Sequence, residues 1–258
     1  MVGLRADLVA ALQSFAAVPR IVVASDFDGC LAPIVSHPAD ARPDPAAVAA
    51  LVELAALRDT TVAIVSGRAR ADLASLAALP DSSVTLIGSH GSEFDDGFTS
   101  PVTDEQRALL ATVTDELSAI SARFPGTMVE TKPASSVLHV RNAADAESAE
   151  RALDQARRGP ATHAGVHATE GKAVLELAVI DTGKGHALDL LRERGGAEAV
   201  CYLGDDVTDE NAFRHLTGPG DVGIKVGDGD TVAGHRIAGP ELVGAVLRTI
   251  LVERSTAL

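Results

Sequence analysis

Two aspartates separated by one residue follow the first strongly apolar run of the chain, in the stretch Asp26-Phe27-Asp28-Gly29. In an open parallel sheet, ligands bind beyond the carboxyl ends of the strands, and a strand over 21–25 would place both carboxylates there. Alternation along the strand would send Asp26 and Asp28 to the same side, while Gly29 would let the chain turn sharply. Two carboxylates this close repel each other unless a proton or a cation separates them. The stretch is therefore either a site for a cation or proton, or an ordinary turn capped by aspartate.

A second acidic stretch contains four carboxylates within six residues, after the apolar run AVCYLG that ends at residue 204. Some of these acids have an ordinary explanation as caps and first-turn residues of a following helix. Concentrating like charge at a strand end is nevertheless costly unless a cation is bound there. Oxygen ligands without clustered His or Cys favour Mg²⁺. The candidate ligands and their neighbours are Asp205, Asp206, Asp209 and Glu210.

A hydroxyl and a lysine occupy comparable positions elsewhere in the chain. Ser66, followed by Gly67 and Arg68, ends another apolar run, where its hydroxyl could donate to a phosphate oxygen or simply cap a helix. Lys184 falls at an expected helix start, which normally favours acids, so it indicates an anionic partner or else a surface lysine. The sequence holds 18 Arg and only four Lys, which makes a functional need for each lysine more probable than usual. The lysines are Lys132, Lys172, Lys184 and Lys225.

These residues need a scaffold, and the first and last thirds of the chain predict one. Short β-branched runs alternate there with stretches rich in Ala and Leu, which is typical of βαβ units around a parallel sheet. The predicted strands are 21–25, 61–66, 84–88, 199–203 and 222–226, and the predicted helices are 45–58, 69–79, 184–194, 210–215 and 240–252. The fold class is therefore α/β.

The middle of the chain has a different pattern. Thr103 and Gln106 form a capping-box pattern that opens a helix ending near residue 124. Strand-like runs and one helix follow, which indicates a partly antiparallel sheet with helices on one face. The strands are expected at 128–131, 137–141, 163–169 and 173–179, and the helix at 144–158. We expect an α+β cap domain at 101–180, inserted into a core formed by 1–100 and 181–258.

Composition limits the classes of partner. With 46% hydrophobic residues in 258, the chain can bury a substantial core, and its apolar runs are far shorter than the ~20 residues that cross a bilayer. The N-terminal segment lacks the features of a signal peptide. The two cysteines have no disulfide or zinc spacing. A net charge of −14 with seven aromatics (one Tyr, six Phe) makes nucleic acid an unsuitable partner. We expect a soluble cytoplasmic protein, of an oligomeric state that the sequence does not determine.

Taken in order, DxDG, Ser-Gly-Arg, Lys and GDDxxD resemble the motifs of the haloacid dehalogenase superfamily. Longer strings resemble the trehalose-6-phosphate phosphatase family within it: DFDGCLAPI, SGR, GSHGSE, ETKPASSVLHVR, GKAVLELAV, DTGKGHAL and GDDVTDENAF. The resemblance spans the whole core and reaches the cap. It implies a Rossmann-like core with an inserted cap, and Mg²⁺-dependent hydrolysis of trehalose 6-phosphate to trehalose and phosphate through an aspartyl-phosphate.

The resemblance also implies a role for each matching core residue. Asp26 would be the nucleophile, and Asp28 the general acid and then the general base. Ser66 and Lys184 would bind the phosphate. Mg²⁺ would be held by Asp26, the Asp28 carbonyl and Asp205, with Asp206 and Asp209 supporting it from the next layer or joining it. Cys30 stands where family members usually have Thr, and a thiol is a weaker donor, so the loop is expected to be held less firmly.

In the cap, the resemblance assigns the sugar hydroxyls to Glu130, Lys132 and Glu176. Glu130 and Lys132 would lie on one face of a strand, although exposed cross-strand charges are the ordinary reading of such residues. Further substrate contacts are expected from Arg68, His90 and Arg141.

Three alternatives remain open at this point. Another sugar phosphatase of the same fold could act on sucrose phosphate or a glycosyl-glycerate phosphate. A phosphoacceptor signalling module also combines acids, a hydroxyl and a lysine, but the inserted cap and Asp28 argue against it. A catalytically dead sugar-phosphate-binding domain is disfavoured because the expected catalytic residues are intact, namely Asp26, Asp28, Lys184 and Asp205.

Overall fold

The computed structural model describes residues 3–79, 82–95, 97–98, 102–171, 173–180 and 183–257. Lys172 and the first two residues of DTGKGHAL lie outside them. The chain divides into two compact units, one made of Met1–Asp95 with Gly183–Leu258 and the other of Asp96–Thr182. The second unit is therefore a single insertion into the first, and its role as a cap stays a prediction.

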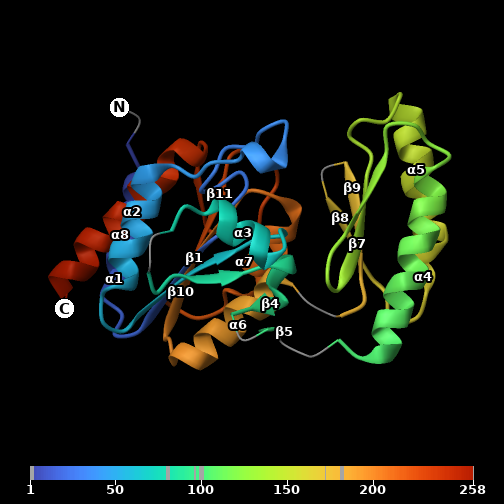
Figure 1. The fold of residues 1–258 in the computed structure, drawn as a ribbon. Coiled ribbons are helices and arrows are strands. Elements are labelled where there is room, and N and C mark those ends of the chain that lie inside the picture. The colour runs from blue at the N-terminus through green and yellow to red at the C-terminus, as the bar shows by residue number, and fades with distance from the viewer. Residues whose placement is uncertain are drawn as a thin grey trace. The chain divides into compact units, whose positions relative to one another are not determined.

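The first unit is built on a six-stranded parallel sheet with the order β12-β11-β10-β1-β2-β3 (Figure 1). Its strands are β1 (Ile21–Ser25), β2 (Thr60–Val65), β3 (Thr85–Ile87), β10 (Ala199–Gly204), β11 (Val222–Val226) and β12 (His235–Ile237). The parallel pairing of β1 with β10 and with β2 confirms the predicted α/β class. All five residues of β1 are buried, as expected for a central strand covered on both faces.

Helices cover the two faces of this sheet. Ile21 and Val23 of β1 pack into the cluster formed with α1 (Ala6–Ala16), α2 (Pro45–Ala55), α3 (Arg70–Leu76) and α8 (Val243–Ala257). Val22 and Ala24 face the opposite cluster, formed with α6 (Lys184–Gly195) and α7 (Val207–His215). Successive side chains of β1 thus point to opposite faces of the sheet and contribute to the hydrophobic cores on both faces. Short elements complete the unit: β4 (Glu93–Phe94) and the 3₁₀ turns η1 (Pro38–Asp40), η2 (Ser89–Gly91) and η4 (Pro240–Leu242).

A buried arginine joins the last helix to distant backbone. Arg254 of α8 is only 1% exposed, and its guanidinium donates to oxygens at the end of α1, in the turn after α1 and at the start of β2. The acceptors are the carbonyls of Ala16, Val18, Pro19 and Asp59 and the hydroxyl of Thr60. Because the buried guanidinium donates to these oxygens from all three of its nitrogens, this contact is a structural one.

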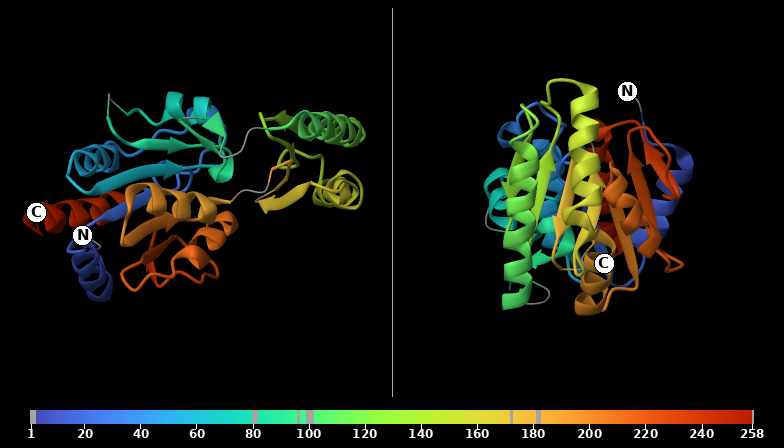
Figure 2. Two further views of the ribbon diagram at one scale, coloured as in Figure 1. Left: turned by 90° about the horizontal axis from the view of Figure 1, so that it is seen from below. Right: turned by 90° about the vertical axis from the view of Figure 1, so that its right-hand side faces the viewer.

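The second unit has a four-stranded antiparallel sheet with the order β6-β7-β9-β8. Its elements are β5 (Gly97–Phe98), α4 (Asp104–Ser121), β6 (Met128–Thr131), β7 (Ser135–His139), α5 (Ala146–Arg158), η3 (Pro160–Thr162), β8 (His167–Gly171) and β9 (Val174–Ala178). The capping box of Thr103 and Gln106 is present at the start of α4. Figure 2 shows α4 and α5 lying side by side over one face of the sheet, where Leu138, Leu175 and Leu177 pack against them.

The predicted elements of both units are confirmed in type, with ends that differ by a few residues. The helix α1 and the edge strand β12 had no prediction, and neither had the short elements β4, β5, η1, η2 and η3. The last predicted helix begins as the turn η4 and continues as α8 to Ala257. Within the described residues, no helix combines the length and apolarity that crossing a membrane requires.

Candidate active site

Three carboxylates meet at the carboxyl-terminal edge of the parallel sheet. Asp26 follows β1 and Asp205 follows β10, and these strands are neighbours in parallel register, with Ser25 opposite Leu203. The Asp26 amide donates to the Leu203 carbonyl at 2.8 Å, which continues the pairing to the strand end. Asp209, from the first turn of α7, completes the group, and one oxygen from each of the three lies within 4.8 Å of the others. The sheet edge thus concentrates negative charge, as the sequence predicted.

A buried lysine balances part of that charge. Lys184 begins α6 and is 2% exposed, and its Nζ lies 2.7 Å from both Asp26 Oδ2 and Asp209 Oδ1. Burial alone would lower the pKa of Lys184, but the charges of Asp209 and Asp26 outweigh it and raise that pKa. The lysine is therefore an ammonium held in place by two carboxylates.

Excess negative charge remains in the cluster and favours a cation. Burial raises the pKa of Asp26 well above its usual value, against the opposing charge of Lys184. Burial, followed by the charge of Asp209, raises the pKa of Asp205 to about 7. Both carboxyls therefore ionise less readily than usual, chiefly because they are buried, and a divalent cation beside them would favour their ionised forms.

The donor set and the space around it suit Mg²⁺. All candidate ligands are oxygens, which hard cations prefer. Gly29 has a φ of +78°, and a Cβ there would lie 2.0 Å from Asp205 Oδ2, so only glycine lets the carboxyl approach the backbone this closely. If Mg²⁺ binds here, Asp26 and Asp205 would hold it.

Asp209 is fully buried and its carboxylate already has four donors. Oδ1 accepts from Lys184 at 2.7 Å and from the Tyr202 hydroxyl at 2.6 Å, and Oδ2 accepts from the amides of Asp205 and Asp206, both at 2.9 Å. Lys184 and these other donors outweigh burial and lower the pKa of Asp209. Asp209 therefore fixes the loop that carries Asp205, whereas Asp206 caps α7 by accepting from Val207 N at 2.7 Å.

Asp28 has a different partner from Asp26, although the sequence expectation placed both on one side. The guanidinium of Arg68 donates from Nε to Asp28 Oδ2 at 2.7 Å and from Nη2 to Oδ1 at 2.6 Å. The Arg68 side chain is 14% exposed and that of Asp28 is 36% exposed. Arg68 was predicted as a substrate contact, but in this structure its guanidinium is paired with Asp28, the candidate general acid and base.

Ser66 and His90 belong to two loops that are tied together. Ser66 is 1% exposed and follows β2; its carbonyl accepts from the His90 amide at 2.9 Å, and its Oγ accepts from the Arg68 amide at 3.2 Å. The His90 ring lies against Gly67, where an added Cβ would come within 2.5 Å of the ring. These contacts position the Ser66 hydroxyl at the same sheet edge.

Lys225 is a site residue that the sequence analysis did not select. It lies in β11, is 4% exposed, and its Nζ donates to the Asp205 carbonyl at 2.5 Å, with Glu210 Oε1 at 3.9 Å. The available signal was a lysine inside the apolar strand VGIKV, in a chain with only four lysines. Lys225 therefore holds the loop of Asp205 from β11, the strand next to β10 in the sheet.

In the second unit, the predicted sugar contacts share the sheet face that is not packed against α4 and α5. Glu130 and Glu176 both pair in register with Val137 of β7, so their side chains point the same way. Lys132 Nζ lies 3.1 Å from Glu176 Oε2, with side-chain exposures of 7% and 9%. Ser135 Oγ donates to Glu176 Oε1 at 2.6 Å.

Two further polar residues lie on or near this sheet face, His139 and Arg141. Glu130 Oε2 lies 2.8 Å from His139 Nε2, and this hydrogen bond lowers the pKa of Glu130 despite its partial burial. Ser135 and His139 were not predicted as site residues. They alternate with Val137 along β7, so their spacing places them on the same sheet face as Glu130 and Glu176, and this spacing was the available signal. Arg141 is exposed and lies two residues beyond the end of β7.

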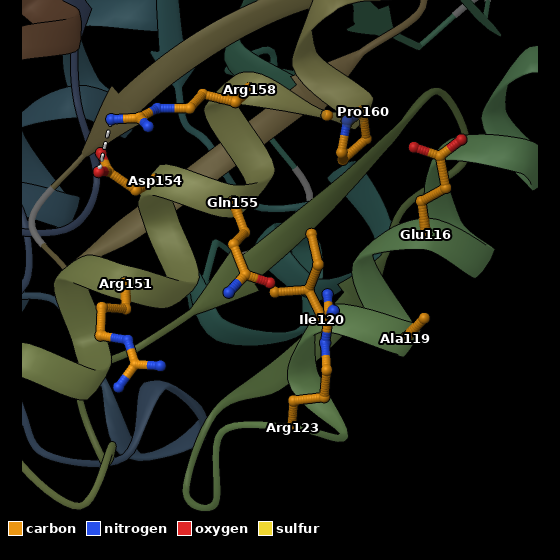
Figure 3. A pocket seen from close by; sticks show the side chains of 10 residues that line it. Glu116, Ala119, Ile120, Arg123, Arg151, Asp154, Gln155, Arg158 and Pro160 are labelled. Carbon is orange, nitrogen blue, oxygen red and sulfur yellow. Dashed lines mark hydrogen bonds and ion pairs between the residues drawn. The ribbon is translucent and has the colours of Figure 1, made fainter.

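A hollow of about 590 Å³ lies elsewhere in this unit, between α4 and α5 (Figure 3). Ile120 and Gln155 point toward each other across it, and Arg158 turns aside to pair with Asp154. Among the described residues that line it, none belongs to the predicted site. The carboxylate cluster of the first unit and the polar sheet face of the second unit therefore remain the two candidate functional regions.

Residues 24–237 match the protein family described as trehalose-phosphatase. A trehalose-phosphate phosphatase of Mycobacterium marinum is 37% identical over 258 aligned positions, covering 93% of this chain and 63% of that protein. The trehalose-6-phosphate phosphatase of Escherichia coli is 30% identical, covering 83% of this chain and 80% of that protein. This chain thus spans less than two thirds of the mycobacterial relative.

Solved structures show the same fold. The C-terminal domain of Candida albicans trehalose-6-phosphate phosphatase superposes with a TM-score of 0.83 at 22% identity, covering 97% of this chain and 98% of that one. A haloacid dehalogenase-like hydrolase from Bacillus subtilis gives a TM-score of 0.62 at 14% identity, covering 88% and 98%. With the family match across most of its length and the Escherichia coli relative at 30% identity, this chain belongs to the trehalose-phosphatase family.

Proposed function

We propose that this chain hydrolyses trehalose 6-phosphate to trehalose and inorganic phosphate, with Mg²⁺ held by Asp26 and Asp205. The observation that carries the proposal is the buried Asp26 carboxylate, with Lys184 Nζ at 2.7 Å and Asp205 beside it. The substrate comes from the names of the relatives in Escherichia coli and Mycobacterium marinum. A carboxylate nucleophile with these neighbours suits transfer of a phosphoryl group.

In the first step, an Asp26 oxygen attacks phosphorus while the bond from phosphorus to the sugar oxygen breaks. Hydrolysis of a phosphate monoester is among the slowest uncatalysed reactions, and forming an aspartyl-phosphate divides it into two easier steps. Asp28 gives a proton to the departing sugar oxygen, so trehalose leaves neutral. In the second step, Asp28 takes a proton from water, whose oxygen displaces Asp26 from phosphorus, and inorganic phosphate is released.

Positive charge and donors must offset the repulsion between Asp26 and the anionic phosphate. Lys184 is fixed where it can contact both, and the buried Ser66 hydroxyl provides a further donor for a phosphoryl oxygen. Mg²⁺, when bound, would stabilise negative charge on the transferred group. Asp209 and Lys225 would act by holding Lys184 and the Asp205 loop in place.

We assign recognition of the sugar to the polar sheet face of the 96–182 unit, which we propose is the cap. Glu130, Lys132 and Glu176 offer two carboxylates and an ammonium, which match the many hydroxyls of a disaccharide. Ser135 and His139 each hold one of the carboxylates. His90 and Arg141 remain proposed as additional substrate contacts.

Phosphate release from a panel of esters tests this function. The panel contains trehalose 6-phosphate, sucrose phosphate, a glycosyl-glycerate phosphate, glucose 6-phosphate and p-nitrophenyl phosphate, each with Mg²⁺ and with excess chelator. We expect the highest kcat/KM for trehalose 6-phosphate and loss of activity in chelator that added Mg²⁺ restores. Preference for another sugar phosphate would overturn the substrate, and full activity in chelator would overturn the metal.

We also propose that the protein works in the cytoplasm on a small-molecule substrate. Cys30 and Cys201 are both buried free thiols, and burial, followed by the charge of Asp26, raises the pKa of Cys30 well above its usual value. Such thiols are compatible with a reducing compartment. Cell fractionation that places the native protein outside the cytoplasm would contradict this.

A further inference from the structure

The two oxygens of Asp28 are both taken by one guanidinium. Nε and Nη2 of Arg68 form parallel hydrogen bonds of 2.7 and 2.6 Å to Oδ2 and Oδ1. Fork-to-fork pairs of this kind fix orientation as well as charge. Because each oxygen has its own donor, one can be released while the other stays bound.

The backbone around Asp28 is fixed independently of this pair. Gly29 N donates to the Ala32 carbonyl at 2.8 Å, and Ala32 N donates to the Phe27 carbonyl at 2.9 Å. What remains free is rotation of the Asp28 side chain, which is 36% exposed. Without Arg68, this side chain would have several rotamers open to it.

Arg68 is itself anchored, so it can serve as a fixed point. Its guanidinium carbon lies 5.6 Å from the centre of the Phe27 ring, and Phe27 is fully buried. Its amide donates to Ser66 Oγ at 3.2 Å, which ties the same residue to the loop that follows β2. Arg68 thus connects the loops that follow β1 and β2.

We propose that Arg68 is a positioning residue that holds Asp28 in the orientation needed for proton transfer. In this arrangement one Asp28 oxygen leaves its Arg68 donor to serve the sugar oxygen or water, and the second hydrogen bond keeps the carboxyl in place. The inference rests on the proposed role of Asp28 as general acid and base. It gives Arg68 a task different from direct contact with the substrate.

Leaving-group dependence tests the proposal. Phenyl phosphate and p-nitrophenyl phosphate have nearly the same shape, but phenolate is the poorer leaving group and needs protonation more. For Arg68→Ala, we expect kcat on phenyl phosphate to fall about 10- to 100-fold, with a much smaller loss on p-nitrophenyl phosphate and little change in KM. Added guanidinium ion should restore part of kcat, whereas an equal concentration of tetramethylammonium should not. Arg68→Lys, which cannot hold both oxygens, should fall between wild type and Arg68→Ala.

A double-mutant cycle separates this role from direct phosphate binding. If Arg68 acts only through Asp28, Arg68→Ala added to Asp28→Asn should cause no further loss of kcat. Arg70→Ala is the matched control, because Arg70 is two residues away and pairs with the exposed Asp95. It should behave as wild type. A further loss in the double variant, or a rise in KM without a change in kcat, would overturn the proposal.

Crystal structures of wild type and Arg68→Ala give a readout that does not depend on turnover. We expect one Asp28 rotamer in wild type and several in the variant. A single, unchanged rotamer in Arg68→Ala would overturn the positioning role even with an active wild type. A wild type inactive on every ester would overturn the proposed function and, with it, the premise of this inference, whereas an active wild type with equal losses on both aryl phosphates would overturn this inference alone.

Discussion

At the scale of single residues, charge pairing gives different tasks to side chains that look alike in the sequence. Asp26 contacts a buried lysine, Asp28 contacts an arginine, and Asp209 accepts four hydrogen bonds. Asp26 and Asp209 are both buried beside the Lys184 ammonium, but the two oxygens of Asp209 are already taken by four donors, which leaves Asp26 as the candidate nucleophile. Position in the motif therefore predicted that these aspartates matter, and their partners distinguish what each can do.

Replacing Asp26 with Asn should abolish turnover. An amide of the same shape has no comparable nucleophilicity, so we expect kcat to fall by about three orders of magnitude or more. Phosphate release from p-nitrophenyl phosphate measures the loss, and circular dichroism checks that the fold is intact. Substantial activity in a variant free of wild-type enzyme would show that another group attacks phosphorus.

Glu176→Gln should reduce hydrolysis of trehalose 6-phosphate far more than hydrolysis of p-nitrophenyl phosphate. Gln keeps the shape of Glu176 but weakens acceptance from Lys132 and from sugar hydroxyls, at an expected cost of about 1–3 kcal/mol, or about 5- to 150-fold. The conservative change is preferable because truncating one member of a buried ion pair also destabilises the fold.

Glu170→Gln is the matched control for Glu176→Gln. Glu170 lies on the neighbouring strand β8, is half exposed, and pairs with Arg157 of α5. Its activity on both substrates should equal that of wild type. If Glu176→Gln lost activity equally on both substrates, Glu176 would serve folding of the unit instead of sugar recognition.

At the scale of elements, the loop between β10 and α7 is held from several directions. Tyr202 and Lys184 contact Asp209 Oδ1, the amides of Asp205 and Asp206 contact Oδ2, and Lys225 contacts the Asp205 carbonyl. This arrangement gives the candidate metal ligand a rigid support, which carboxylate sites for Mg²⁺ require.

Tyr202→Phe should lower the free energy of unfolding by about 1.5–3 kcal/mol, because it removes a donor to a buried, charged acceptor. The ring contact with Phe213 is retained, so the change isolates the hydroxyl. Urea denaturation followed by circular dichroism measures the loss. An unchanged midpoint would mean that Asp209 is satisfied by its other three donors.

Sequence periodicity predicted most elements because strong local signals agree with the tertiary structure. The five residues of β1 and the capping box of α4 are examples. The edge strand β12 was missed because its three residues, His235 to Ile237, include two polar ones and show no apolar run. The pairing of Asp28 with Arg68 could not be predicted, since it joins loops 40 residues apart through side-chain rotamers.

At the scale of the whole molecule, Arg254 connects parts of the core that are far apart in sequence. It lies 195 residues after Asp59, whose carbonyl it binds, and its other acceptors are Thr60 and three carbonyls at or just after the end of α1. Arg254→Met should therefore destabilise the core by about 3–5 kcal/mol, because four carbonyls and the Thr60 hydroxyl each lose a hydrogen bond from a charged donor.

Arg254→Lys should rescue only part of this stability, since one ammonium cannot reach all the acceptors. Arg248→Met is the matched control, because Arg248 is exposed on the same helix. Thermal and urea denaturation compare the three variants. Equal stability of Arg254→Met and Arg248→Met would show that water satisfies the carbonyls instead.

The contact of Tyr202 with Asp209 has a spectroscopic consequence. This sequence contains one tyrosine and no tryptophan, so fluorescence excited at wavelengths that its six phenylalanines do not absorb arises from a single phenol. That phenol donates at 2.6 Å to the carboxylate that supports the Asp205 loop. Asp209, to which the Tyr202 hydroxyl donates, belongs to the same carboxylate cluster as Asp26 and Asp205. A cation that binds to Asp26 and Asp205 would therefore change the electric field at the Tyr202 ring. Metal binding and loop rearrangement can therefore be followed on the native chain by emission intensity, without any label.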